Sequence, residues 1–160
     1  MKLLNSLIAG LLILFTLSEV NYPIFQPQSS LAVFAMAGLV LCFLNFPFLK
    51  KWKEKPWSKI LDSCLAVLAV VCCGYIISQT EPLFSSIWVN GQPLGNRPGQ
   101  ETGFDIAIAI VLLLLVLESA RRCMGWALPT LAILFVLYAL TGPKLPDWLI
   151  PHRGYGLERT

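Results

Sequence analysis

The sequence predicts an all-α, polytopic membrane protein with four to five transmembrane helices in a single domain over residues 1–160. Of its 160 residues, 56% are hydrophobic and 13% are charged, and the mean hydropathy of +0.70 exceeds that of ordinary soluble domains. Long apolar runs recur, and a helix needs about 20 mostly apolar residues to cross the core of a bilayer. The runs predict spans at about residues 3–20, 31–49, 60–78, 105–122 and 125–141, with an outer loop at 79–103 and a C-terminal tail at 142–160.

The first span follows Lys2 and therefore begins as a secretory signal peptide does. The segment after it, residues 19–23, lacks the pattern of small residues that marks a cleavage site. Because several further apolar runs follow, we expect this first helix to be retained as a span.

A group of lysines separates the second span from the third. They are Lys50, Lys51, Lys53, Lys55 and Lys59. Short basic loops stay in the cytoplasm, and so the N-terminus and this loop are predicted to be cytoplasmic. Topology and contact with anionic lipids explain the lysines, and no nucleic-acid partner is expected.

The third span carries a strip of small side chains at spacings of three and four. Its members are Ser63, Ala66, Ala69 and Cys73. Such strips let membrane helices approach closely, and we predict helix packing here. The cysteines lie within or at the ends of apolar runs without a C-x-x-C pair, and His152 is the only histidine. We therefore predict no metal site and no cofactor, and we interpret the cysteines as packing residues.

The loop at 79–103 falls on the outer side and is rich in turn-forming residues. It has two interpretations, a flexible connector or a docking surface for a partner outside the membrane. Arg97 is its only basic residue. If the loop is a docking surface, Arg97 is held away from the membrane and steers the encounter.

The fourth and fifth spans are separated by the charged residues Glu118, Arg121 and Arg122. Charges at membrane depth cost a few kcal/mol each, and the i,i+3 and i,i+4 spacings pair both guanidinium groups with the carboxylate. The alternatives are an assembly boundary at the membrane surface or an ion or substrate site at the midplane. The turn that follows, residues 123–125, favours the boundary. Pro129 and the modest length of the fifth run leave a lateral or re-entrant segment as the alternative to a fifth span.

Motifs of enzymes are absent from the sequence: no nucleophile elbow, phosphate-binding loop, zinc signature or dinucleotide fingerprint occurs. We therefore predict that the chain is not an enzyme. It also has no internal repeat and no pair of interrupted helices of the kind that forms a solute site. These properties indicate a subunit of a larger assembly.

Several segments of the last third resemble one family. They are LESARR (117–122), GWALP (125–129), LFVLYALTGP (134–143), HRGY (152–155) and LER (157–159). They are similar to the small membrane region of TRAP (tripartite ATP-independent periplasmic) transporters, in the TAXI branch. Before residue 117 the likeness is one of hydropathy alone. The resemblance fits either a separate small subunit or the N-terminal small-subunit region of a fused permease.

The resemblance implies a scaffold role in a secondary transporter of a bacterial or archaeal inner membrane. The expected partners are a large permease subunit, an extracytoplasmic substrate-binding protein and membrane lipids. Together they carry out symport of an organic acid, a carboxylate, driven by an ion gradient. Two alternatives stand beside this one: the small subunit of a different tripartite carboxylate importer, and a membrane thiol-disulfide enzyme, which the placement of the cysteines disfavours.

Overall fold

The computed structural model describes residues 2–48 and 56–141, and this part of the chain is helical with no strand. The prediction of an all-α fold is confirmed. The long helices are α1 (Lys2–Asn21), α2 (Pro27–Asn45), α3 (Pro56–Thr80), α4 (Gly103–Met124) and α5 (Ala127–Thr141). Three short 3-10 helices, η2 (Pro82–Ile87), η3 (Val89–Gly91) and η4 (Leu94–Asn96), fold the loop between α3 and α4.

Among the described residues, three helices are long and apolar enough to cross a membrane, namely Pro27–Asn45, Trp57–Thr80 and Gly103–Met124. Two shorter apolar helices, Asn5–Asn21 and Ala127–Ala139, accompany them. The structure therefore has the helices of a polytopic membrane protein. The second helix begins four residues before the predicted span, because Pro27 occupies its first turn, where the missing N–H costs nothing.

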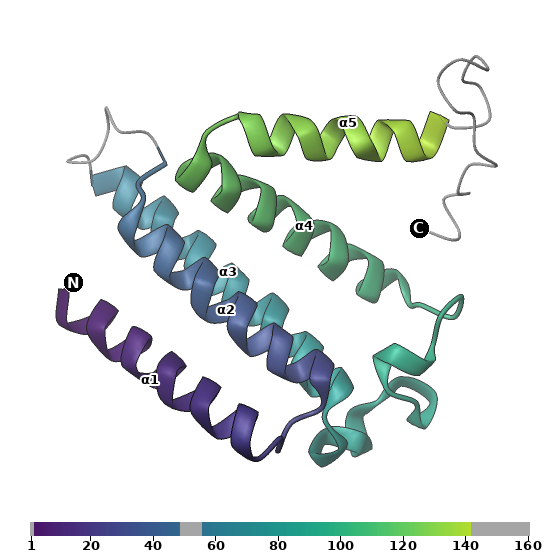
Figure 1. Ribbon diagram of the computed structural model, residues 1–160. Helices are drawn as coiled ribbons and strands as arrows, with labels where there is room; N and C mark the ends of the chain where they lie inside the picture. The colour runs from purple at the N-terminus through teal and green to yellow at the C-terminus, as the bar shows by residue number, and fades with distance from the viewer. Residues whose placement is uncertain (1, 49–55, 142–160) are drawn as a thin grey trace.

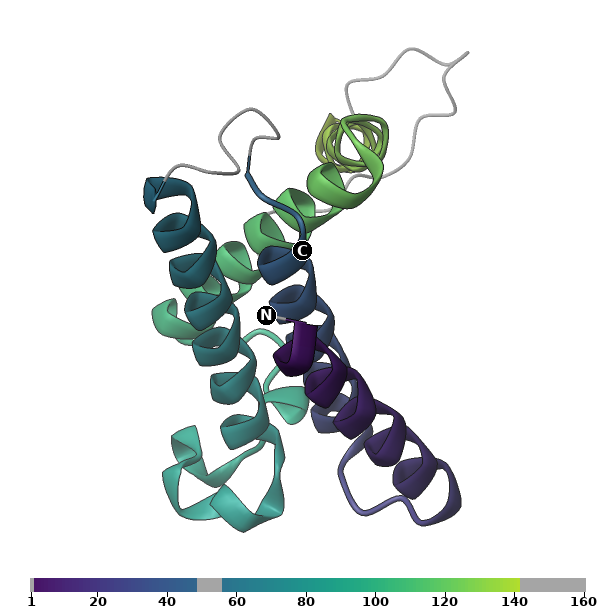
Figure 2. The same cartoon turned by 90° about the vertical axis from the view of Figure 1, so that its left-hand side faces the viewer.

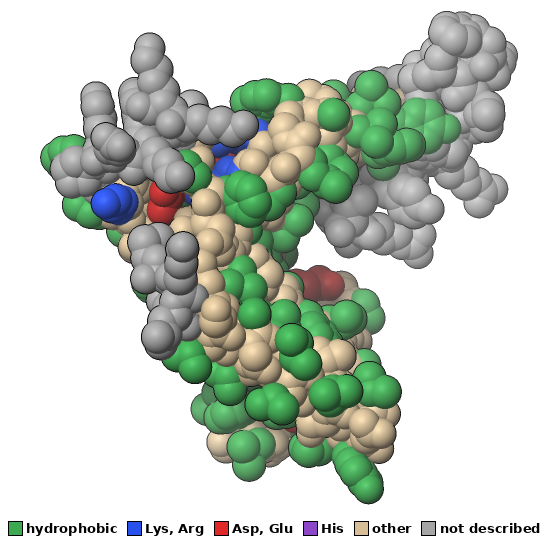
Figure 3. Space-filling view, turned by 60° about the vertical axis from the view of Figure 1, so that its left-hand side comes forward, with side chains coloured by type: hydrophobic (Ala, Val, Ile, Leu, Met, Phe, Trp, Pro, Cys, Tyr) green, Lys and Arg blue, Asp and Glu red, His purple; other side chains and the backbone are tan. Residues whose placement is uncertain are grey.

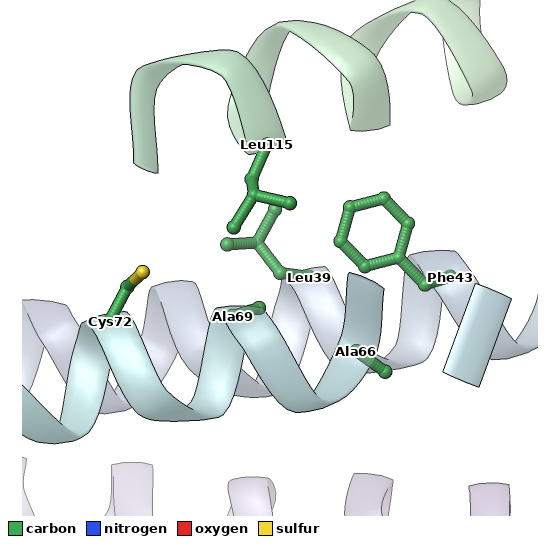
Figure 4. Packing of buried hydrophobic residues seen from close by; sticks show 6 residues of the cluster. All are labelled: Leu39, Phe43, Ala66, Ala69, Cys72 and Leu115. Atoms are coloured by element: carbon green, nitrogen blue, oxygen red, sulfur yellow. The ribbon is translucent and has the colours of Figure 1, made fainter. Parts of the chain in front are cut away.

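The helices α2 and α3 lie side by side and antiparallel, and α1 packs along α2 (Figures 1 and 2). Phe15 of α1 meets Phe34 of α2 edge to face, with ring centroids 5.4 Å apart. The helix α4 packs across the α2–α3 pair. Figure 4 shows the core where the three helices meet, formed by Leu39, Phe43, Ala66, Ala69, Cys72 and Leu115.

Small side chains on α3 make this close approach possible. Ala66, Ala69 and Cys73 are buried, and Ala69 and Cys73 have no exposed surface. Ser63 is exposed, and so the predicted packing strip is wrong at its first member. The buried face runs instead through Ser58 and Asp62, which are in register with Ala66 at the i,i+4 spacing.

The helix α5 lies beside α4 (Figures 1 and 2). The chain turns out of α4 at Gly125, whose φ of +83° belongs to the region that favours glycine. Within the described chain α5 packs mainly on α4, and most of its apolar side chains, from Leu131 to Leu137, are exposed. Its length and placement keep a lateral segment and a fifth span as alternatives.

The loop at 79–103 is folded against the ends of the helices. The Trp88 indole donates to the carbonyl of Ser78 at 3.2 Å, and the Gln79 amide donates to the carbonyl of Ile87 at 3.2 Å. Gly95 lies against Gln28 at the start of α2, where a side chain at position 95 would collide with the Gln28 amide. The loop is therefore packed on the bundle and does not behave as an open connector.

We expect Ala69→Leu to destabilise the bundle by about 1–3 kcal/mol, because Ala69 is fully buried in the core and a larger side chain would overpack it. Ser63→Leu is the matched control, since Ser63 is exposed on the same helix. Thermal unfolding of the purified variants in detergent checks both. Equal unfolding temperatures for the two leucine variants would contradict the observed packing face.

Candidate functional site

The candidate site is a charge cluster of Glu118, Arg121, Arg122 and Asp62, at the junction of α2, α3 and α4. One oxygen of Glu118 accepts from Arg122 Nε at 2.8 Å and from Arg121 at 2.8 Å. The other oxygen accepts from Arg121 Nε, also at 2.8 Å. Arg121 therefore binds the carboxylate with two hydrogen bonds, the strong geometry for this pair. The spacing in α4 brings these three side chains together as expected.

Asp62 of α3 is a member of the cluster that the sequence reasoning missed. Its carboxylate accepts from Arg122 at 2.7 Å, and the side chains of Arg122 and Asp62 are only 1% and 12% exposed. One feature of the sequence could have identified it: Asp62 is the only acidic residue in α3 and lies close to the start of an apolar span. An ionisable group at such a position needs a partner, and Arg122 provides it.

The two arginines also bind the end of α2. Arg122 donates to the carbonyl of Phe46 at 2.9 Å, and Arg121 donates to that of Phe48 at 3.2 Å. These carbonyls lie just beyond the last helical residue, where backbone acceptors lack partners inside the helix and cations are favoured. Arg122 lies over the Phe43 ring, 4.9 Å from its centroid, so the cluster also rests on the apolar core.

The cluster is electrically balanced and its charges are used inside the chain. Two carboxylates face two guanidinium groups, and Glu118 gives both oxygens to the arginines. Among the described residues, no three His, Cys, Asp or Glu side chains come together as metal ligands. The mutual pairing of these four charges fits the interpretation as an assembly boundary.

A second polar network lies at the opposite ends of α3 and α4. Asp105 and Thr102 form a capping box: the Thr102 backbone N–H donates to Asp105 at 2.8 Å, and the Asp105 N–H donates back at 3.2 Å. The Tyr75 hydroxyl donates to the same carboxylate at 2.6 Å. The guanidinium of Arg97 lies 3.8 Å from it and donates to Gln79 at 3.1 Å.

Arg97 is therefore misplaced in the sequence analysis, which put it on an exposed docking rim. The residue is 2% exposed. The reason is electrostatic: the buried carboxylate of Asp105 at the start of α4 needs a counter-charge, and the loop folds back to supply it. Within the loop at 79–103, no guanidinium group is therefore presented to a docking partner.

Further carboxylates on the same side hold the first turn of α2. Glu81 accepts from the backbone N–H of Gln26 at 2.8 Å, and Glu19 accepts from the Ser30 hydroxyl at 2.7 Å. Glu101, outside the spanning helices, accepts from the backbone N–H of Gly99, which lowers the pKa of its carboxyl group. These local contacts were not predicted.

The structure also places the remaining predicted residues. Lys59 is exposed at the start of α3, whereas Lys50, Lys51, Lys53 and Lys55 lie outside the described residues. The cysteines are free, and two that are distant in sequence meet, because the sulfur atoms of Cys42 and Cys123 are 3.3 Å apart. Sequence spacing gave no sign of this contact.

Comparison with protein-family models, with curated proteins and with solved structures finds no match.

We expect Glu118→Gln to destabilise the protein more than Asp62→Asn, because Glu118 balances two arginines and Asp62 shares one of them. Because the Glu118 side chain is partly exposed, we expect Glu118→Gln to lower the free energy of unfolding by about 3 kcal/mol or less. The exposed acid Glu101 supplies the control, Glu101→Gln, which should unfold close to the wild-type temperature. Thermal unfolding in detergent ranks the stabilities of the three variants. An unchanged unfolding temperature for Asp62→Asn would show that Asp62 does not belong to the cluster.

Arg97→Gln should lower the yield and the unfolding temperature of the protein, because it leaves the buried carboxylate of Asp105 without its counter-charge. Adding Asp105→Asn should restore part of the loss, since the pair is then neutral. A docking cation behaves differently, with normal stability and a salt-dependent defect confined to partner binding. If Arg97→Gln showed normal stability and a salt-dependent defect in partner binding alone, Arg97 would not act as the counter-charge of Asp105.

Proposed function

We propose that this chain is the small membrane subunit of an ion-gradient-driven, binding-protein-dependent importer of organic acids, as in the TAXI branch of TRAP transporters. It acts as a stationary scaffold for a larger permease and has no enzymatic activity of its own. It resides in the inner membrane of a bacterium or archaeon with its N-terminus in the cytoplasm. The likeness of segments in the last third to that family supports the assignment.

The observation that carries the proposal is the uncovered surface of α4. Only 11% of its most apolar stretch is buried within the chain, against 33% for α2 and 28% for α3. Exposed Ile110 and Leu114 of α4 and Leu134 of α5 belong to this surface. Lipid covers apolar side chains as well as protein does, so the exposure is compatible with both. Apolar side chains of α1, such as Leu14, are equally exposed, and the resemblance of the segments from residue 117 onward favours a protein partner on the α4–α5 side.

The distribution of charge supports a scaffold over a transport site. Figure 3 shows one face of the molecule, on which apolar side chains predominate and charged ones gather mainly at one end. In the described spanning helices the acidic and basic side chains lie toward the ends, with Asp62 near the start of α3 and Asp105 in the first turn of α4. Glu118 is six residues from the end of α4 and is fully paired. Solute binding is therefore assigned to the permease and the binding protein.

The test of the proposal is reconstitution. The chain alone, in liposomes with an imposed sodium gradient, should accumulate no organic acid, whereas the complex with its permease and loaded binding protein should. We expect the chain and the permease to co-purify in equal amounts. Accumulation by the chain alone above that of empty vesicles would refute the scaffold assignment.

The surface that binds the permease can be tested separately. We expect Leu134→Trp on α5 to reduce recovery of the permease in co-purification, because the larger side chain disturbs the packed interface. Leu14→Trp on α1 is the matched control, since the two leucines are 60% and 65% exposed. Loss of the permease with Leu14→Trp and not with Leu134→Trp would move the interface to α1.

A further inference from the structure

The five cysteines fall into three settings, and one of them is a pair joining two helices. Cys64 is exposed, and Cys72 and Cys73 are buried neighbours on α3. Cys42 of α2 and Cys123 of α4 are separated by 81 residues, yet their sulfur atoms lie 3.3 Å apart. This contact belongs to neither the predicted packing strip nor the proposed scaffold role, and it has no counterpart among the other thiols.

We propose that Cys42 and Cys123 are an oxidisable dithiol that forms a reversible disulfide between α2 and α4. The sulfur atoms are already in contact, and bond formation requires an approach of little more than 1 Å to the usual length of about 2.05 Å. The backbone around the pair is well held. Cys123 follows Arg122, which is bound to Asp62 and to the end of α2, and Cys42 precedes the buried Phe43.

The two thiols differ in access, which sets the order of the reaction. Cys123 is exposed and Cys42 is buried. The oxidant is a small-molecule disulfide, such as oxidised glutathione. The Cys123 thiolate attacks one of its sulfurs and expels one thiolate, which leaves a mixed disulfide on Cys123. Cys42 then loses its proton and attacks the Cys123 sulfur, expelling the second thiolate. Two electrons pass to the reagent, which leaves as two thiols with the two protons of the pair.

The consequence is a covalent tie at the junction that holds the charge cluster. The disulfide would fix the end of α4, from which α5 departs at Gly125, to the end of α2. The predicted topology puts this end on the cytoplasmic side, where thiols are normally kept reduced. The bond therefore forms under oxidative conditions and is removed by thiol reductants, which makes the pair a redox-sensitive lock on the arrangement of α2 and α4.

The experiment uses the full chain purified in detergent under reducing conditions. It is exposed to oxidised glutathione, alkylated, digested and examined by mass spectrometry. In the wild type we expect alkylatable thiols to fall from five to three, with a Cys42–Cys123 linked peptide that dithiothreitol removes. Cys42→Ser and Cys123→Ser should form no internal disulfide. Cys64→Ser is the matched control and should still form it.

Two results would overturn the proposal. One is a stable glutathione adduct on Cys123 without a linked peptide, which means that Cys42 cannot reach it. The other is a linked peptide formed equally well in protein unfolded with detergent and denaturant, which means that the fold does not select the pair. The oxidised wild type should also unfold at a higher temperature than the reduced form, and this shift should be absent in Cys42→Ser.

Discussion

The ion pair between Arg122 and Asp62 is the interaction on which the arrangement of the spanning helices depends. Asp62 would be an unpaired charge near the start of an apolar helix without Arg122, and Arg122 shares its charge between Asp62 and Glu118. Arg122 is the more demanding of the two, since its side chain is 1% exposed and must be satisfied from within the chain. Glu118 and the carbonyl of Phe46 also accept hydrogen bonds from Arg122, and the second contact joins α2 to the same point. Three helix ends are therefore fixed together by one guanidinium group.

Packing follows from this fixed point. Apolar helices in lipid gain little from hydrophobic burial against one another, so close contact depends on shape. Ala66 and Ala69 follow Asp62 along one face of α3 and let α2 and Leu115 of α4 approach. The arginine that anchors the junction also covers the Phe43 ring at the edge of that core. The Arg122–Asp62 contact thus sets the register in which Ala66 and Ala69 face α2 and α4.

The sequence predicted the class of the fold and the local geometry, and it failed where contacts are distant along the chain. Hydropathy identifies spanning helices because the bilayer fixes their length, and the Glu118–Arg121–Arg122 pairing follows from helical periodicity alone. Asp62 and Arg122 are 60 residues apart, and no local rule relates them. Ser63 was assigned to the packing face because its side chain is small. The buried face instead includes Asp62, the charged residue beside Ser63, which has a partner across the junction.

Arg97 shows the same limit at the other end of the protein. The residues that flank Arg97 in sequence form turns and suggest an exposed side chain. Its position is decided instead by the carboxylate of Asp105, which caps α4. The consequence is that α4 is tied to α3 at both ends by ionic and hydrogen-bonded contacts. Between these ties, one side of α4 packs on the core and the other carries exposed side chains such as Leu114.

The charged side chains of this helix have ion-pair partners within the chain, so its position does not depend on a charge supplied by another protein. Its free surface is apolar and continues onto α5, so binding a second membrane protein there need not expose or bury a charge. Association would then be governed by side-chain shape on α4 and α5, as is usual between membrane helices.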